Sequence, residues 1–85
     1  MQMTESNLLY LLFQKEVSID GDFYYYTLDI ANGLSLISND SDEAEKEGWR
    51  VFLFNTDPVI EFTTKYQIWE FIALIGSLKK HNEKI

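Results

Sequence analysis

The sequence predicts an α+β fold: an antiparallel sheet of four or five strands, built as a meander plus a hairpin, with a C-terminal helix packed on one face and a short N-terminal helix. Three observations predict it. Residues 23–30 form an aromatic, β-prone run, as in a strand. Turn sequences separate the β-prone runs, at Asp20-Gly21 and at Thr56-Asp57-Pro58. Residues 65–80 carry apolar side chains at helical spacing.

Length and composition indicate a single small acidic domain spanning residues 1–85. The chain is 46% hydrophobic and 15% aromatic, which is enough apolar surface to form a core. It has no cysteine, so disulfides and thiolate metal ligands are excluded and a cytoplasmic location is expected. The apolar run 8–13 is too short for a signal peptide or a membrane span.

The N-terminal residues 4–14 are expected to form a short helix that Thr4 or Ser6 can cap. The run contains leucines and no β-branched residue after Thr4, which favours a helix. Six consecutive apolar residues fit a buried strand equally well, so the state of residues 7–14 stays open.

The central residues predict a meander. Residues 17–19 lead into a two-residue type I′ turn at Asp20-Gly21, because this pair readily adopts positive φ. The strand 23–30 follows, and a turn at residues 31–33 leads to a strand at 34–38. Alternation places four apolar side chains of the first long strand on one face: Tyr24, Tyr26, Leu28 and Ile30.

Residues 39–48 are polar and acidic and are expected to form one or two exposed helical turns. Asp42 and Glu45 resemble a capping box, and Gly48 is placed to end the helix.

A second hairpin is predicted from strands 49–55 and 59–63. In the expected pairing, Phe52 and Phe54 share a face with Ile60 and Phe62. The first arm is apolar on both faces, so both faces of the sheet should be covered, and the N-terminal segment is the expected cover for the second face.

The C-terminal helix is predicted over residues 65–80, with Thr64 and Gln67 as its capping box. Its main apolar stripe consists of Ile68, Phe71, Ile72, Ile75 and Leu78. A second set of residues extends the apolar band around the helix and forms the candidate oligomer interface: Tyr66, Trp69 and Ala73.

Catalytic and metal sites find little support in the sequence. His81 is the single histidine and lies in a polar, lysine-flanked tail, so a catalytic triad is excluded and the chain is predicted not to be an enzyme. The acidic residues 39–43 lack the spacing of a calcium loop, and no glycine-rich phosphate loop is present. No metal and no cofactor is therefore expected.

Charge placement gives the sharpest functional hypothesis. The net charge is -7, and residues 16–45 hold eight acidic residues and no basic one. This distribution argues against direct binding to nucleic acid or membrane and favours a protein partner with a basic surface. The sequence predicts a non-enzymatic acidic protein-binding module, in the sharpest form an inhibitor of phage or mobile-element type that mimics nucleic acid in a basic site. The candidate contacts are Asp20, Asp22, Asp40, Asp42, Glu43 and Glu45.

Three other interpretations remain open. The acidic run can simply solvate the protein. The chain can be an assembly module that forms a homodimer through the apolar side of the last helix or through an edge strand. Alternatively, residues 24–26 can form the wall of a small-molecule pocket.

Overall fold

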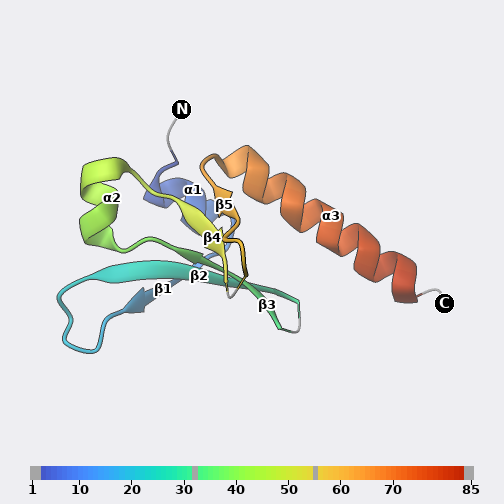
Figure 1. The fold of residues 1–85 in the computed structure, drawn as a ribbon, viewed down its shortest axis with the longest axis horizontal. Coiled ribbons are helices and arrows are strands. Elements are labelled where there is room, and N and C mark those ends of the chain that lie inside the picture. The colour runs from blue at the N-terminus through green and yellow to red at the C-terminus, as the bar shows by residue number, and fades with distance from the viewer. Residues whose placement is uncertain (1–2, 32, 55, 84–85) are drawn as a thin grey trace.

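The computed structural model describes residues 3–31, 33–54 and 56–83, with the side chains of the last helix described as far as Gly76. Five antiparallel strands follow one another in chain order, with one helix before them, one among them and one after them (Figure 1). The predicted α+β class is confirmed. The elements are α1 (Glu5–Tyr10), β1 (Gln14–Val17), β2 (Tyr24–Ala31), β3 (Leu34–Ser38), α2 (Ser41–Glu47), β4 (Val51–Leu53), β5 (Glu61–Phe62) and α3 (Lys65–Glu83).

The hydrophobic core lies on one face of this sheet. Strand register places Leu28, Leu36 and Leu53 opposite one another, and directly opposed residues share a face. Leu8 of α1 and Ile68 of α3, both fully buried, belong to the same core cluster. Both helices therefore pack on one face, and the prediction that the N-terminal segment covers the other face is wrong. Side chains there are only half-buried: Tyr25, Thr27, Ile37 and Phe52.

The N-terminal helix is confirmed but is shorter than predicted. Thr4 caps α1: its Oγ1 accepts the Asn7 N–H at 3.3 Å, and Asn7 Oδ1 accepts the Thr4 N–H at 3.0 Å. The helix ends at Tyr10, and Leu12 adopts a positive φ of 73°. The predicted end at residue 14 is wrong, because Gln14 already pairs with Thr27 in the sheet.

The loop between β1 and β2 is wider than the predicted two-residue turn. The Gly21 N–H donates to the Ser18 carbonyl at 3.0 Å, and the Ser18 N–H donates to the Phe23 carbonyl at 2.9 Å. A type I′ turn requires a positive φ at both Asp20 and Gly21. Gly21 has a φ of 78°, but Asp20 is not among the described residues with positive φ. The Ser18 hydroxyl holds this wider loop by donating to Asp20 at 2.8 Å.

The second hairpin forms with a different register from the one predicted. Phe52 lies opposite Glu61, and Val51 lies opposite Phe62. Phe52 therefore does not share a face with Phe62, and that prediction is wrong, because a shift of one residue moves a side chain to the other face. Val51 and Phe62 face the core, while Phe52 faces away from it.

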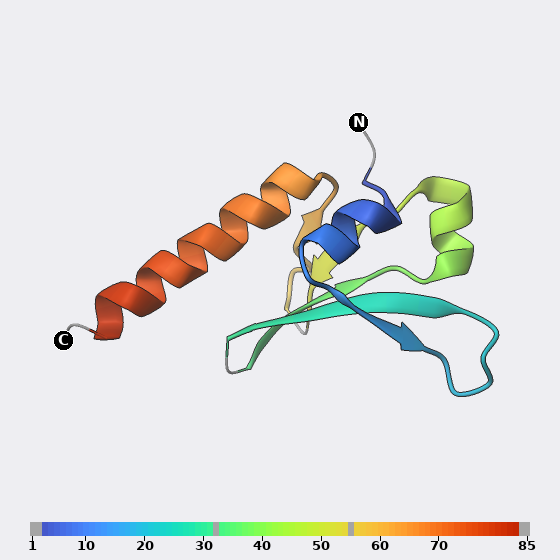
Figure 2. The same ribbon diagram turned by 180° about the vertical axis from the view of Figure 1, so that it is seen from behind.

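Helix α3 begins as predicted and then leaves the sheet. Gln67 Oε1 accepts the Thr64 N–H, and Thr64 Oγ1 accepts the Gln67 N–H, each at 3.2 Å, which confirms the capping box. Ile68 is buried, while Phe71 and Ile72 pack against the core. Beyond them the helix projects past the sheet (Figure 2). The predictions for the side chains of Leu78 and His81 lie outside the described residues.

The projecting helix gives the molecule an elongated shape of 47 × 30 × 26 Å. Its radius of gyration is 13.7 Å, whereas a compact domain of this length would have about 12 Å. Within the described part of the chain, no helix combines the length and apolar character needed to cross a membrane.

Candidate protein-binding site

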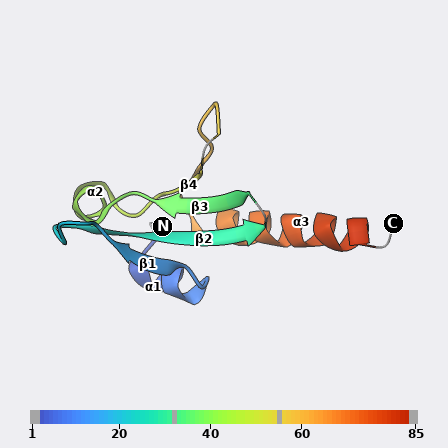
Figure 3. The ribbon, with the colours of Figure 1, turned by 90° about the horizontal axis from the view of Figure 1, so that it is seen from below.

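The six candidate carboxylates come from two segments that lie at one end of the molecule. Asp20 and Asp22 belong to the β1–β2 loop, and the other four belong to α2 and its cap. Helix α2 is attached beside the start of β2, where the Tyr24 N–H donates to Ser41 Oγ at 3.1 Å. In Figures 1 and 3 this loop and α2 lie at the same end of the molecule, far from the free end of α3. We call the β1–β2 loop and residues 40–47 the acidic end.

Helix α2 is fixed at both of its termini. Asp40 is its N-cap and accepts the Glu43 N–H at 2.8 Å, so the predicted capping box at Asp42 and Glu45 is wrong. Gly48 ends the helix as predicted, with φ 87° and ψ 168°, a conformation that is essentially restricted to glycine. Asn39, which precedes the N-cap Asp40, is 5% exposed and connects the two ends of α2. Its Nδ2 donates to the Gly48 carbonyl, and its Oδ1 accepts the Arg50 N–H, both at 3.0 Å.

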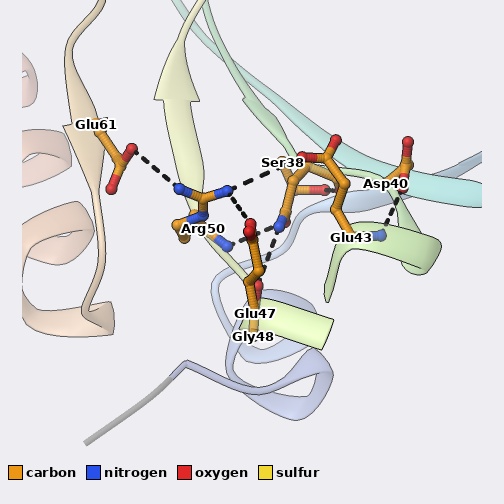
Figure 4. A network of polar contacts seen from close by, with 8 residues as sticks. Ser38, Asp40, Glu43, Glu47, Gly48, Arg50 and Glu61 are labelled. Carbon is orange, nitrogen blue, oxygen red and sulfur yellow. Dashed lines mark hydrogen bonds and ion pairs between the residues drawn. The ribbon is translucent and has the colours of Figure 1, made fainter. Parts of the chain in front are cut away.

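Arg50 lies among three carboxylates of its own chain (Figure 4). Its Nη2 is 2.6 Å from Glu47 Oε2 and 3.9 Å from Glu43 Oε2, and its Nη1 is 3.6 Å from Glu61 Oε1. These groups balance the guanidinium charge, so Arg50 does not give the acidic end a positive patch. It links α2 to β5 across β4.

The six candidates therefore divide into two groups. Three of them take part in local structure. Asp20 accepts a hydrogen bond from the Ser18 hydroxyl, Asp40 caps α2, and Glu43 faces Arg50. The hydrogen bond from the Ser18 hydroxyl lowers the pKa of Asp20 below its usual value. The second group consists of Asp22, Asp42 and Glu45, which are exposed on the surface, as are Asp20 and Glu43 of the first group.

A hollow of about 390 Å³ lies beside α2 and combines carboxylates with aromatic rings. It is lined by Glu5, Tyr24, Ser41, Asp42, Ala44, Glu45 and Trp49. The rings of Tyr24 and Trp49 are 6.0 Å apart, and Lys15 Nζ lies 4.0 Å from the centre of the Tyr24 ring. Carboxylates next to aromatic faces suit a lysine or arginine side chain, which gains from both.

The phenols beside this hollow are held neutral. Tyr24 donates its hydroxyl to Glu5 Oε1, and this hydrogen bond, with burial and the nearby acidic charges, raises the pKa of Tyr24 to about 12. Burial, followed by the Glu5 charge, raises the pKa of Tyr26. Neither phenol is poised to ionise near neutral pH. Tyr26 is 1% exposed and Tyr25 lies on the other face, so only Tyr24 of residues 24–26 lines the hollow.

This hydrogen bond predicts a stability change at alkaline pH. The ordinary pKa of the phenol is 10.0, and folding raises it to about 12, so its contribution to stability is full below the first value and is lost as pH rises through the second. We expect the Tyr24→Phe variant to lose less stability than wild type between about pH 9 and pH 12 in urea unfolding. Parallel losses in the two proteins would contradict this.

The candidate oligomer-interface residues lie on α3, away from the acidic end. Tyr66 is 67% exposed, Trp69 is 62% exposed, and Ala73 is also exposed. The first two, with Lys65, line a groove of about 630 Å³ between α3 and α1, whose other wall consists of Ser6, Asn7, Tyr10 and Leu11. Ala73 is outside this lining.

Sequence reasoning identified Asp42 and Glu45 but missed other residues that line the acidic hollow. Glu5 was not predicted as a site residue. Its only sequence feature is its position in the first turn of a helix, where an acidic residue is favoured by the helix dipole whether or not it has a function. Tyr24 was anticipated as part of a pocket wall in the small-molecule alternative, whereas Trp49 was not assigned to any site. Among the described residues, no three His, Asp or Glu side chains are grouped so that they could hold a metal ion. The chain matches no protein-family model, no curated protein and no solved structure, so its function is inferred from this site.

Proposed function

We propose that this protein is a non-enzymatic binding module whose acidic end docks onto a basic surface of another protein. The observation that carries the proposal is that the β1–β2 loop and residues 40–47, which together carry the six candidate acidic residues, lie at one end of the molecule. The positive charge of Arg50 is balanced by the nearby carboxylates of Glu43, Glu47 and Glu61. The acidic end therefore attracts cations over a distance and accelerates association with a basic partner.

The contact chemistry has two parts. Asp22, Asp42 and Glu45 present exposed carboxylates, and the hollow beside α2 accepts one lysine or arginine side chain between its acids and its rings. A surface of lysines and arginines that normally holds phosphates has matching chemistry. The proposed partner is accordingly a cytoplasmic nucleic-acid-binding protein, which this module inhibits in the manner of phage or mobile-element proteins.

Neutralising the acidic end should weaken partner binding. The double variant Asp42→Asn/Glu45→Gln removes two exposed charges of the acidic end, and we expect about a tenfold rise in Kd at low salt. The matched control is Asp57→Asn/Glu70→Gln, which changes the net charge equally at exposed positions outside the acidic end. Equal losses in both variants would indicate a general charge effect and would contradict a local site.

The partner can be found by affinity capture from a host lysate at low and at high salt, followed by mass spectrometry. We expect a basic nucleic-acid-binding protein that is released as salt rises, and whose nucleic-acid binding this module then blocks. Recovery of salt-resistant partners alone would contradict the proposal. The Asp42→Asn/Glu45→Gln variant serves as the negative control in the same capture.

A further inference from the structure

Helix α3 carries a second apolar stripe that the sheet does not use. Tyr66, Trp69, Ala73 and Gly76 recur at spacings of three, four and three residues and are all exposed. This is the spacing of a helix–helix seam. It lies on a different side of α3 from Ile68, the buried residue that faces the core.

The distal half of α3 has little support from its own domain. The main contact of α3 with the sheet is to β5, and the residues that pack against the core end at Ile72. Beyond this point the helix projects from the body in both Figure 2 and Figure 3. An isolated helix of roughly 12 residues is marginal in water, since most helices in proteins are stabilised by tertiary packing. The distal half therefore gains much of its stability from whatever covers it.

Charge indicates what can cover it. The molecule carries a net charge of -7, and the acidic end lies far from the free end of α3. The sequence of α3 itself holds three lysines and two glutamates. Two copies that meet along α3 thus bring near-neutral surfaces together and keep their acidic ends apart, whereas a basic partner has no electrostatic reason to choose this helix.

We propose that two copies of this chain pair through α3 in an antiparallel, twofold-symmetric dimer. In this arrangement the distal half of one α3 enters the groove between α1 and α3 of the other copy. Trp69 of each copy then covers Gly76 of the other, where nothing lies within 4 Å of the position that a Cβ would occupy. Antiparallel pairing also places the two sheets at opposite ends, whereas parallel pairing would bring both acidic ends to the same side.

Sedimentation analysis of the full chain tests this proposal directly. We expect a concentration-dependent dimer that persists at high salt, and at least a tenfold rise in its dissociation constant in the Trp69→Glu variant. Leu74→Glu is the matched control, because Leu74 is 56% exposed on a different side of α3 and should leave the dimer intact. A monomer at all concentrations, or a dimer that only Leu74→Glu dissociates, would overturn the proposal. Unfolding curves of both variants check that they remain folded.

Single-cysteine variants test the direction of pairing, and the chain contains no cysteine of its own. Ala73 lies near the middle of the stripe, so Ala73→Cys should form an intermolecular disulfide on oxidation. Tyr66→Cys should not, because antiparallel pairing places the two copies of residue 66 at opposite ends of the seam. Efficient crosslinking through position 66 would show parallel pairing, and equal crosslinking of Leu74→Cys and Ala73→Cys would show random collision; either result overturns the proposal.

Discussion

Replacing Ile68 with alanine should lower the free energy of unfolding by about 3 kcal/mol. Ile68 is fully buried and is the residue of α3 that reaches deepest into the core, next to the half-buried Phe71 and Ile72. An 85-residue domain has a total stability of about 4 to 13 kcal/mol. This one substitution therefore removes a large part of the margin, because the loss of buried area and the cavity add together.

Urea unfolding followed by circular dichroism measures this loss, with Leu74→Ala as the control. Leu74 is 56% exposed on the same helix, so its substitution should change stability by no more than about 0.5 kcal/mol. Similar losses in the two variants would mean that α3 is held by a different set of contacts from those described.

The Asn39→Ala variant should lose about 2 to 3 kcal/mol of stability and should also weaken partner binding. The Asn39 side chain donates to the Gly48 carbonyl and accepts the Arg50 N–H, and its removal leaves these half-buried backbone groups without their partner. Both bonds hold the C-terminal end of α2 against β4. Their loss should increase amide hydrogen exchange in α2 more than in β2 and β3.

Lys46→Ala provides the comparison on the same helix, because Lys46 is exposed and lies in its last turn. We expect little change in stability or in hydrogen exchange for that variant. If Asn39→Ala raises exchange uniformly across the sheet, the residue supports the whole fold and is not a local anchor of α2.

The sequence predicted those elements whose causes are local. The placement of alternate β2 side chains on the core face, the capping box at Thr64 and Gln67, and the end of α2 at Gly48 each depend on neighbouring residues, and each is confirmed. The prediction of a two-residue turn at Asp20-Gly21 was wrong, because the hydroxyl of Ser18 stabilises a wider loop. The face covered by α1 could not be predicted, because it depends on contacts between Leu8 and residues far along the chain.

The same distinction applies to the site. The acidic residues were evident from composition, but their convergence depends on contacts such as Tyr24 with Ser41, which are separated by 17 positions. Asp40 has a structural role because α2 starts directly after it, and Glu43 has one because Arg50 lies nearby. Neither the start of α2 nor the position of Arg50 can be read from the periodicity of the sequence. The broad apolar band of the last helix predicted a second contact surface at Tyr66 and Trp69; in the structure both are exposed and line the groove between α3 and α1, and their role as an interface stays a prediction.

The strand order of the sheet has a kinetic consequence. Each strand pairs with the strand that precedes or follows it in the chain, and the longest connection is the one between β3 and β4, which contains α2. Pairing of strands that are neighbours in the chain costs little loop-closure entropy before the contacts form, and domains dominated by local contacts fold rapidly. The slower step should be the docking of α1 and α3, which joins Leu8 to Ile68 across most of the sequence. A transition state with a formed meander and undocked helices would give substitutions at these two positions their main effect on the unfolding rate.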